Sequence, residues 1–212
     1  MPGSKPEKRH EAKPHDPAPG AGLRGVAVFC GAQAGHDPAC RAGAEALGRG
    51  LAEAGLRLVY GGGRIGLMGA LADAAVAAGG VVVGVIPEFL TRREVAHQQI
   101  AELIVTDSMH SRKQRMFELA DAFVMLPGGL GTLDEIVEII TWRQLALHNK
   151  PILLCNVAGA AMPLLALVDA VIDTGFAQPD VRRLFEVAAD VPALLARLQQ
   201  LHRGSGGPAK RL

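Results

Sequence analysis

The chain has 212 residues, of which 49% are hydrophobic, 20% are charged and 4% are aromatic, and its formal net charge is +1. This composition is typical of one ordinary globular domain. The near-zero charge and the scarcity of aromatic side chains argue against a nucleic-acid binder and a polybasic membrane surface. No apolar run reaches the roughly 20 residues of a membrane-spanning helix. The cysteines, Cys30, Cys40 and Cys155, lack metal-ligand spacing, and an odd number of them without a signal peptide predicts a reducing cytoplasm.

The two ends of the chain differ in composition from its middle. Residues 1–22 are rich in proline and mixed charges and almost lack large apolar side chains, so burial cannot offset the entropy lost on ordering them. We therefore expect a disordered tail at 1–22, one folded domain at 23–202 and a flexible tail at 203–212.

Within residues 23–202, short apolar runs alternate with longer helical patterns. The runs predict strands at 24–30, 56–60, 81–86, 100–106, 122–126, 151–155 and 184–187. Between them, helices are predicted at 38–54, 65–78, 109–120, 132–147, 161–173 and 191–201, with an irregular segment at 88–99. Apolar strands separated by helices indicate a parallel sheet covered on both faces. The prediction is a single doubly wound, Rossmann-like α/β domain, with ligands at the carboxyl ends of the strands, where the glycine-rich turns fall.

The first glycine-rich turn, residues 61–66 (GGGRIG), fits GxGxxG between a strand and a helix. One interpretation is a dinucleotide-binding loop, with Glu88 as a ribose partner. Against it, the motif follows the second strand of the domain, whereas a dinucleotide fingerprint normally follows the first. The other interpretations are a loop that faces a different ligand, or glycines that only permit close packing of helix and strand.

The second turn, residues 127–132 (PGGLGT), joins a buried strand to a helix predicted to begin at Thr132. Glycines let the backbone approach an anion, and the unpaired N–H groups of a helix N-terminus face it, so this turn predicts a phosphate site. Glu135 follows three positions later, beside the expected phosphate. A capping box, in which Thr132 caps the helix and Glu135 bonds back to it, remains the structural alternative.

A third stretch, residues 109–115 (MHSRKQR), places cations in the first turns of a helix that Asp107 or Ser108 would cap. Cations there oppose the helix dipole, and local rules are often broken at functional sites. Met109 and Arg112 lie at i and i+3, which brings a guanidinium to the rim that holds both glycine turns. A solvated basic face is the alternative.

Together, residues 60–69 (YGGGRIGLMG), 109–113 (MHSRK) and 127–135 (PGGLGTLDE) resemble the signature motifs of the LONELY GUY family. The similarity continues through 84–87 (GVIP), Arg93-Glu94 and 140–145 (ITWRQL). Members of that family are cytokinin riboside 5′-monophosphate phosphoribohydrolases, long described also as lysine decarboxylases. The resemblance implies a Rossmann-like homodimer that hydrolyses the N-glycosidic bond of AMP or N6-substituted AMP, releasing free base and ribose 5-phosphate. One segment departs from the family, because Ala32-Gln33-Ala34 stands where serines are usual.

The same resemblance implies roles for individual residues. The catalytic pair carries over onto Arg112 and Glu135, and the phosphate loop onto Gly128, Gly129, Gly131 and Thr132. We expect further substrate contacts from Met109, Lys113, Gly62 and Gly63. Neither a metal nor a cofactor is expected.

The expected chemistry is consistent with these residue types. A carboxylate such as Glu135 can stabilise an oxocarbenium-like ribose, whereas Arg112 stays ionised and is suited to hold the purine or its departing charge. Amino-acid decarboxylation ordinarily needs pyridoxal phosphate on a lysine, and no pyridoxal motif surrounds Lys113 or Lys150. The rival hypotheses are a non-catalytic nucleotide or nucleotide-cofactor carrier on the same fold and an NAD(P)-binding oxidoreductase.

Overall fold

The computed structural model describes residues 22–92 and 96–204. The tails predicted at 1–22 and 203–212 therefore lie almost entirely outside the described residues, as does the Arg93-Glu94 pair. No helix in the described part of the chain is long and apolar enough to cross a membrane.

Seven parallel strands form one sheet in the order β4-β3-β2-β1-β5-β6-β7. Their bounds are β1 Gly25–Phe29, β2 Arg57–Tyr60, β3 Val82–Pro87, β4 Glu102–Thr106, β5 Ala122–Met125, β6 Ile152–Cys155 and β7 Glu186–Ala188. The strands from β1 to β4 are added in one direction, and β5 returns to pair with the other side of β1. The strand order thus reverses between β1 and β5, which is where doubly wound sheets open a ligand crevice.

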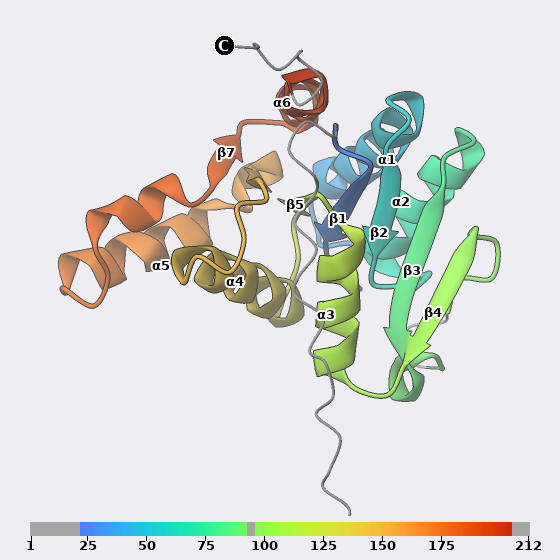
Figure 1. The fold of residues 1–212 in the computed structure, drawn as a ribbon. Coiled ribbons are helices and arrows are strands. Elements are labelled where there is room, and N and C mark those ends of the chain that lie inside the picture. Colours follow the sequence, from blue (N-terminus) through green and yellow to red (C-terminus); the bar gives the residue numbers. More distant parts are fainter. Residues whose placement is uncertain (1–21, 93–95, 205–212) are drawn as a thin grey trace, which may run out of the picture.

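Helices cover both faces of this sheet (Figure 1). The bounds of the α-helices are α1 Pro38–Glu53, α2 Gly66–Ala77, α3 Met109–Leu119, α4 Leu130–Gln144, α5 Met162–Asp173 and α6 Val191–Gly204. Short 3-10 helices, which the sequence patterns did not predict, lie at η1 Glu88–Leu90, η2 Val157–Gly159 and η3 Pro179–Arg183. Apolar residues of α1, α2 and α6 pack on one face, and those of α3, α4 and α5 pack on the other. The predicted doubly wound α/β domain is confirmed.

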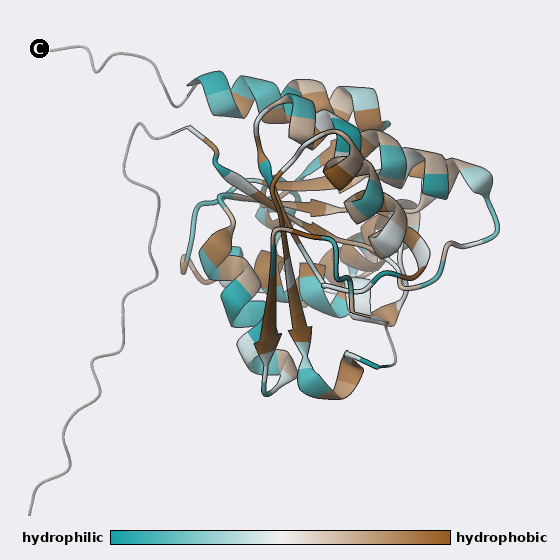
Figure 2. Ribbon diagram, turned by 90° about the vertical axis from the view of Figure 1, so that its right-hand side faces the viewer, coloured by the Kyte–Doolittle hydropathy of each residue, from teal (hydrophilic) through white to brown (hydrophobic). Residues whose placement is uncertain are grey.

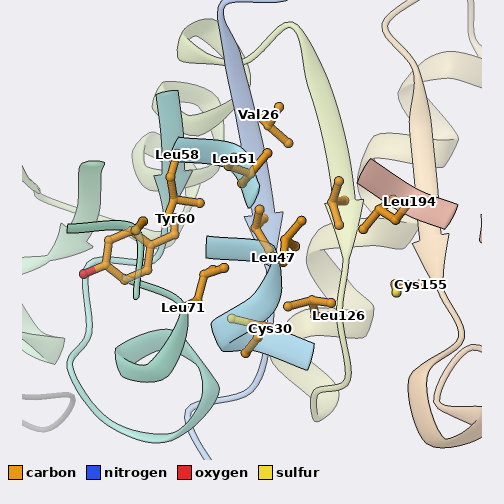
Figure 3. Packing of buried hydrophobic residues seen from close by; sticks show 14 of the residues in the cluster. Val26, Cys30, Leu47, Leu51, Leu58, Tyr60, Leu71, Leu126, Cys155 and Leu194 are labelled. Carbon is orange, nitrogen blue, oxygen red and sulfur yellow. The ribbon is translucent and has the colours of Figure 1, made fainter. Parts of the chain in front are cut away.

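The strands supply both cores because their side chains alternate between the faces. In β1, Val26 and Val28 join the core under α1 and α2, whereas Ala27 and Phe29 join the core under α3 and α4. This is the two-residue period of a strand buried on both sides. Figure 2 shows the strands as a hydrophobic centre between helices with mixed surfaces, and Figure 3 shows Leu47, Leu71 and Leu194 converging on the first face.

Candidate functional site

A cavity of about 670 Å³ opens at the carboxyl ends of β1 and β5, where the strand order reverses. Its wall combines the segment after β1, the glycine turn after β5, the first turns of α2, α3 and α4, and the start of α5. The lining residues are Cys30, Gly31, Ala32, Gln33, Ala34, Gly35, Cys40, Leu67, Met68, Met109, Arg112, Pro127, Gly128, Gly129, Gly131, Thr132, Glu135, Ala160 and Pro163. The segment Ala32-Gln33-Ala34, which departs from the family pattern, lies directly on this wall.

The helix of the second glycine turn begins earlier than predicted. Gly129, with φ −95° and ψ −156°, is the N-cap of α4, and Leu130 rather than Thr132 is its first residue. Leu133 N–H donates to the Gly129 carbonyl at 3.1 Å, and no side chain in the described structure caps the helix. The capping box proposed for Thr132 and Glu135 is therefore wrong, because Glu135 lies in the second turn and not beside the cap. Helix capping therefore does not explain why a glutamate stands at position 135.

The N-terminus of α4 is also open to a ligand. The N–H groups of Leu130, Gly131 and Thr132 precede the first intrahelical donor, so helix geometry leaves them without an intrahelical partner. The turn approaches the helix closely, because a Cβ on Gly128 would overlap the Thr132 hydroxyl. Gly129 and Gly131, in contrast, would place a Cβ in open space. An anion in the cavity can therefore approach the backbone there without meeting a side chain.

Two other helices satisfy their own N-terminal N–H groups with side chains. Asp37 caps α1 by accepting from Ala39 N–H at 2.8 Å. Ser108 and Ser111 form a reciprocal capping box on α3, at 3.1 and 3.2 Å, so the structure selects Ser108 from the two residues, Asp107 and Ser108, that the sequence left open. Each of these two N-termini therefore has a side-chain acceptor for one of its N–H groups, which α4 lacks in the described structure.

The N-terminus of α2 is closed by the backbone of the segment after β1. Leu67 and Met68 N–H both donate to the Gly31 carbonyl, at 3.0 and 3.3 Å. A dinucleotide pyrophosphate would need these same donors, so the geometry does not support the dinucleotide interpretation of residues 61–66. Gly66, at φ +61°, would place a Cβ against the backbone of Ala32, which makes it a packing glycine.

Arg112 is almost wholly buried, at 5% exposure, and its guanidinium reaches across the ends of two strands. Its Nε donates to the Val85 carbonyl and its Nη2 to the Gly61 carbonyl, both at 3.1 Å. The remaining Nη1 lies 3.8 Å from the Met109 sulfur and 3.5 Å from Glu135 Oε1. Main-chain carbonyls thus hold two nitrogens of the guanidinium in place, while the third forms an ion pair with the Glu135 carboxylate in the cavity wall.

The other cations of the same helix make different contacts. Lys113 Nζ lies 3.2 Å from Asp134 and 3.0 Å from Glu138, both on α4. Partial burial by itself lowers the pKa of Lys113, but the hydrogen bonds and charges of Glu138 and Asp134 together outweigh it, and the pKa is raised. Arg115 is an exposed residue paired with Glu118. A solvated basic face therefore describes Arg115 but not Arg112, and Lys113 clamps α3 to α4 outside the cavity.

Cys30 contributes a thiol to the cavity wall beside the charged pair. Burial raises the pKa of Cys30 well above its ordinary value, the carboxylate of Glu135 raises it further, and Arg112 partly opposes both. The thiol therefore stays protonated at neutral pH and is a poor nucleophile. The carboxylate of Glu135 is the better candidate for chemistry in this cavity.

The relatives of this chain agree on one family. The family described as "Possible lysine decarboxylase" matches residues 68–198. A cytokinin riboside 5′-monophosphate phosphoribohydrolase of Rhodococcoides fascians is 46% identical over 177 residues, which cover 83% of this chain and 89% of the relative. One from Arabidopsis thaliana is 43% identical over 175 residues, covering 82% of this chain and 81% of the relative. The chain belongs to the LONELY GUY family.

Solved structures confirm the fold of this LONELY GUY chain. A molybdenum cofactor carrier protein from Chlamydomonas reinhardtii superposes with a TM-score of 0.62 at 23% identity, over 84% of this chain and 97% of that one. A molybdenum cofactor binding protein from Rippkaea orientalis gives a TM-score of 0.65 at 20% identity, over 84% and 96%. At such identities the likeness speaks for the Rossmann-like fold alone.

The structure brings most of the predicted site residues of the LONELY GUY chain to one cavity. Those lining it are Met109, Arg112, Gly128, Gly129, Gly131, Thr132 and Glu135. Gly62, Gly63 and Lys113 are not among the lining residues. The sequence patterns singled out residues 32–34 only as a departure from the family, and they missed the lining residues Gly35, Cys40, Leu67, Ala160 and Pro163. Small and apolar residues carry no chemical signature, and only the fold assembles them.

Proposed function

We propose that this protein hydrolyses the N-glycosidic bond of AMP or of N6-substituted AMP, with the free base and ribose 5-phosphate as products. The observation that carries the proposal is the placement of Glu135. The Glu135 carboxylate lines the same cavity as the open N-terminus of α4, and its Oε1 lies 3.5 Å from Arg112 Nη1. The names of the relatives, which are cytokinin riboside 5′-monophosphate phosphoribohydrolases, point to the same reaction.

The phosphate end of the substrate would bind at the start of α4. The N–H groups of Leu130, Gly131 and Thr132 would donate to the 5′-phosphate, assisted by the helix dipole. Glu135 follows Thr132 by three residues, or about 5 Å along the helix axis. That is close to the span of a ribose between its phosphate and its anomeric carbon. Phosphate binding would thereby place the anomeric carbon beside the carboxylate.

Glu135 and Arg112 would then act on opposite charges. As the bond to the base lengthens, positive charge develops on the ribose, and the Glu135 carboxylate stabilises it and orients the attacking water. Negative charge develops on the departing base, and the positively charged guanidinium of Arg112, whose Nη1 lies beside Glu135 in the cavity, is suited to stabilise it. Arg112 stays ionised, so it acts through charge and hydrogen bonding and not as a proton donor.

The chemistry of a lysine decarboxylase fits the cavity poorly. A pyridoxal cofactor is held by a lysine Schiff base, and no lysine is among the residues that line the cavity in the described structure. Lys150 is buried elsewhere and donates to the Phe117 carbonyl at 2.8 Å. Lys113 is engaged by two carboxylates.

We further propose that the protein is a cytoplasmic homodimer. The apolar side chains of Val137, Leu145 and Leu147 are exposed on α4 and just after it, and burial of such side chains against a second copy would stabilise a dimer. Free, buried thiols at all three cysteines are compatible with a reducing compartment. Light scattering in solution tests the dimer, and a monomer at micromolar concentration would contradict it.

The alternative is a non-catalytic carrier, because molybdenum cofactor carriers share this fold. One assay distinguishes the enzyme from the carrier. The protein is incubated with AMP and with N6-isopentenyl-AMP, and chromatography follows free base and ribose 5-phosphate. Adenosine, which lacks the phosphate, is the matched control and should be cleaved far more slowly. Tight binding of both nucleotides without release of base would refute the enzyme and favour the carrier.

A further inference from the structure

The loop after β2, Gly61–Gly63, holds the guanidinium of Arg112 but has no side chains of its own. The Gly61 carbonyl accepts from Arg112 Nη2 at 3.1 Å, and Gly62 adopts φ +78°. Three successive glycines have more conformational freedom than any other tripeptide. The position of the Gly61 carbonyl, and with it that of Arg112, must therefore be fixed by contacts from outside the loop.

Those contacts come from the backbone of Ala96 and His97. His97 N–H donates to the Gly62 carbonyl at 3.0 Å. Ala96 forms an antiparallel bridge with Gly63. These bonds immediately follow the carbonyl that receives Arg112, so a shift of residues 96–97 would be passed directly to it.

The side chain of His97 is in turn anchored to α2. The residue has no exposed surface, and its Nδ1 accepts from Gln99 N–H at 3.2 Å. The ring proton consequently resides on Nε2, which donates to Asp73 Oδ1 at 2.9 Å. Asp73 lies on α2, the helix whose Leu67 and Met68 line the cavity. One hydrogen-bonded path therefore runs from α2 through His97 to the glycine loop.

We propose that His97 and Asp73 form a latch that positions the guanidinium of Arg112 for the reaction. They are positioning residues, because neither lines the cavity. The inference rests on the proposed function, since it assigns the latch to the turnover that Arg112 supports. Breaking the latch should loosen the Gly61 carbonyl and allow Arg112 to leave its place opposite Glu135.

Asp73→Ala tests the latch with little risk to folding, because the Asp73 side chain is 54% exposed. Asp169→Ala is the matched control, since Asp169 is a 55% exposed carboxylate that pairs with Arg182 and lies on α5, the helix that packs on the opposite face of the sheet from α2. We expect kcat for base release to fall about 10-fold in Asp73→Ala, with a smaller change in KM, and to be unchanged in Asp169→Ala. Asp73→Asn keeps an acceptor oxygen and should restore most of the activity.

Dependence on Arg112 is tested by combining variants. In an Arg112→Ala background, Asp73→Ala should lower the residual kcat no further, because the residue that the latch positions is gone. An equal fractional loss in both backgrounds would show that Asp73 only supports the fold, and a wild-type kcat in Asp73→Ala alone would overturn the latch. His97→Asn should reproduce Asp73→Ala.

The failure of the latch can be told apart from failure of the proposed function. If the wild-type protein releases no base, the proposed function fails, and hydrogen–deuterium exchange decides the latch without turnover. Faster exchange of the His97 amide in Asp73→Ala, with unchanged exchange in Asp169→Ala, supports the latch. Equal exchange in both variants overturns it.

Discussion

Replacing Glu135 by glutamine removes one charge at the centre of the cavity and preserves the size of the side chain. The carboxylate lies 3.5 Å from the Arg112 guanidinium, and Arg112 retains its bonds to the carbonyls of Gly61 and Val85 in the variant. Because α4 is capped by Gly129 and not by Glu135, the substitution removes no helix cap. The Glu135→Gln variant should therefore fold normally but lose catalytic activity.

The expected loss of activity can be worked out from that geometry. A unit positive charge on the ribose, at a distance like that of Arg112, would interact with the Glu135 carboxylate by about 5 kcal/mol at an effective dielectric constant of 20. Since about 1.4 kcal/mol corresponds to a factor of ten, kcat should fall by about 10³-fold. The midpoint of thermal unfolding should move by no more than about 4 °C, the shift that about 1 kcal/mol gives in a domain of this size.

The assay is single-turnover release of base from AMP, beside calorimetric unfolding of the same samples. Glu138→Gln is the matched control, because Glu138 lies on the same helix and pairs with Lys113 at 3.0 Å without lining the cavity. It should unfold much like Glu135→Gln and retain near-normal kcat. A Glu135→Gln enzyme within tenfold of wild type would refute the reasoning, and so would equal losses in the two variants.

Two further substitutions test the cavity around this carboxylate, and a third tests a buried thiol in the core. In Gly61→Ala the new Cβ would overlap Arg112 Nη2. Because the end of the Arg112 side chain can move aside, kcat should fall as in Arg112→Ala while the melting temperature changes little. A normal kcat would contradict the role assigned to Arg112. Gly131→Ala places a Cβ in open space, so the variant should unfold like the wild-type protein. If the substrate phosphate binds at this turn, the new methyl group should raise KM at least about 10-fold. An unchanged KM would show that the phosphate does not bind there. Burial raises the pKa of Cys155 to about 11, which favours the neutral thiol in the fold. The contribution of Cys155 to stability is therefore retained below the ordinary thiol pKa and falls by about 1 kcal/mol on going to pH 10. Because the buried Cys30 thiol gives a loss of the same sign, Cys155→Ala should reduce the alkaline loss in urea unfolding by about that amount without abolishing it, and an unchanged loss would contradict the prediction.

Local patterns in the sequence account for the sheet, most of the helices and the meeting of Arg112 with the glycine turn. Apolar runs, the cap at Ser108 and the i, i+3 spacing of Met109 and Arg112 are signals that lie within a few residues of one another, and each is confirmed. The start of α4 was misplaced because its cap is the extended backbone of Gly129. A backbone cap carries no residue type that distinguishes it, whereas Thr132 and Glu135 imitate a capping box.

The features of the site that sequence patterns did not predict depend on contacts between segments that lie far apart in the sequence. Gly62 and Gly63, expected to contact the substrate, are not among the residues that line the cavity. The Gly31 carbonyl accepts from the first N–H groups of α2, and the backbone of residues 96–97 pairs with the glycine loop. Gly31 and residues 96–97 each lie roughly 30 residues or more along the chain from the groups that they contact, and no sequence motif predicts these contacts. The cavity wall at residues 32–35 is likewise a product of the strand order.

The most direct test of the whole account is a stoichiometric product analysis with N6-isopentenyl-AMP. The wild-type protein should release free base and ribose 5-phosphate in equal amounts. The Glu135→Gln variant should bind the nucleotide with similar affinity and release neither product at a comparable rate. A wild-type protein that binds the nucleotide and returns it intact would contradict the central claim that the cavity at the N-terminus of α4 breaks a glycosidic bond.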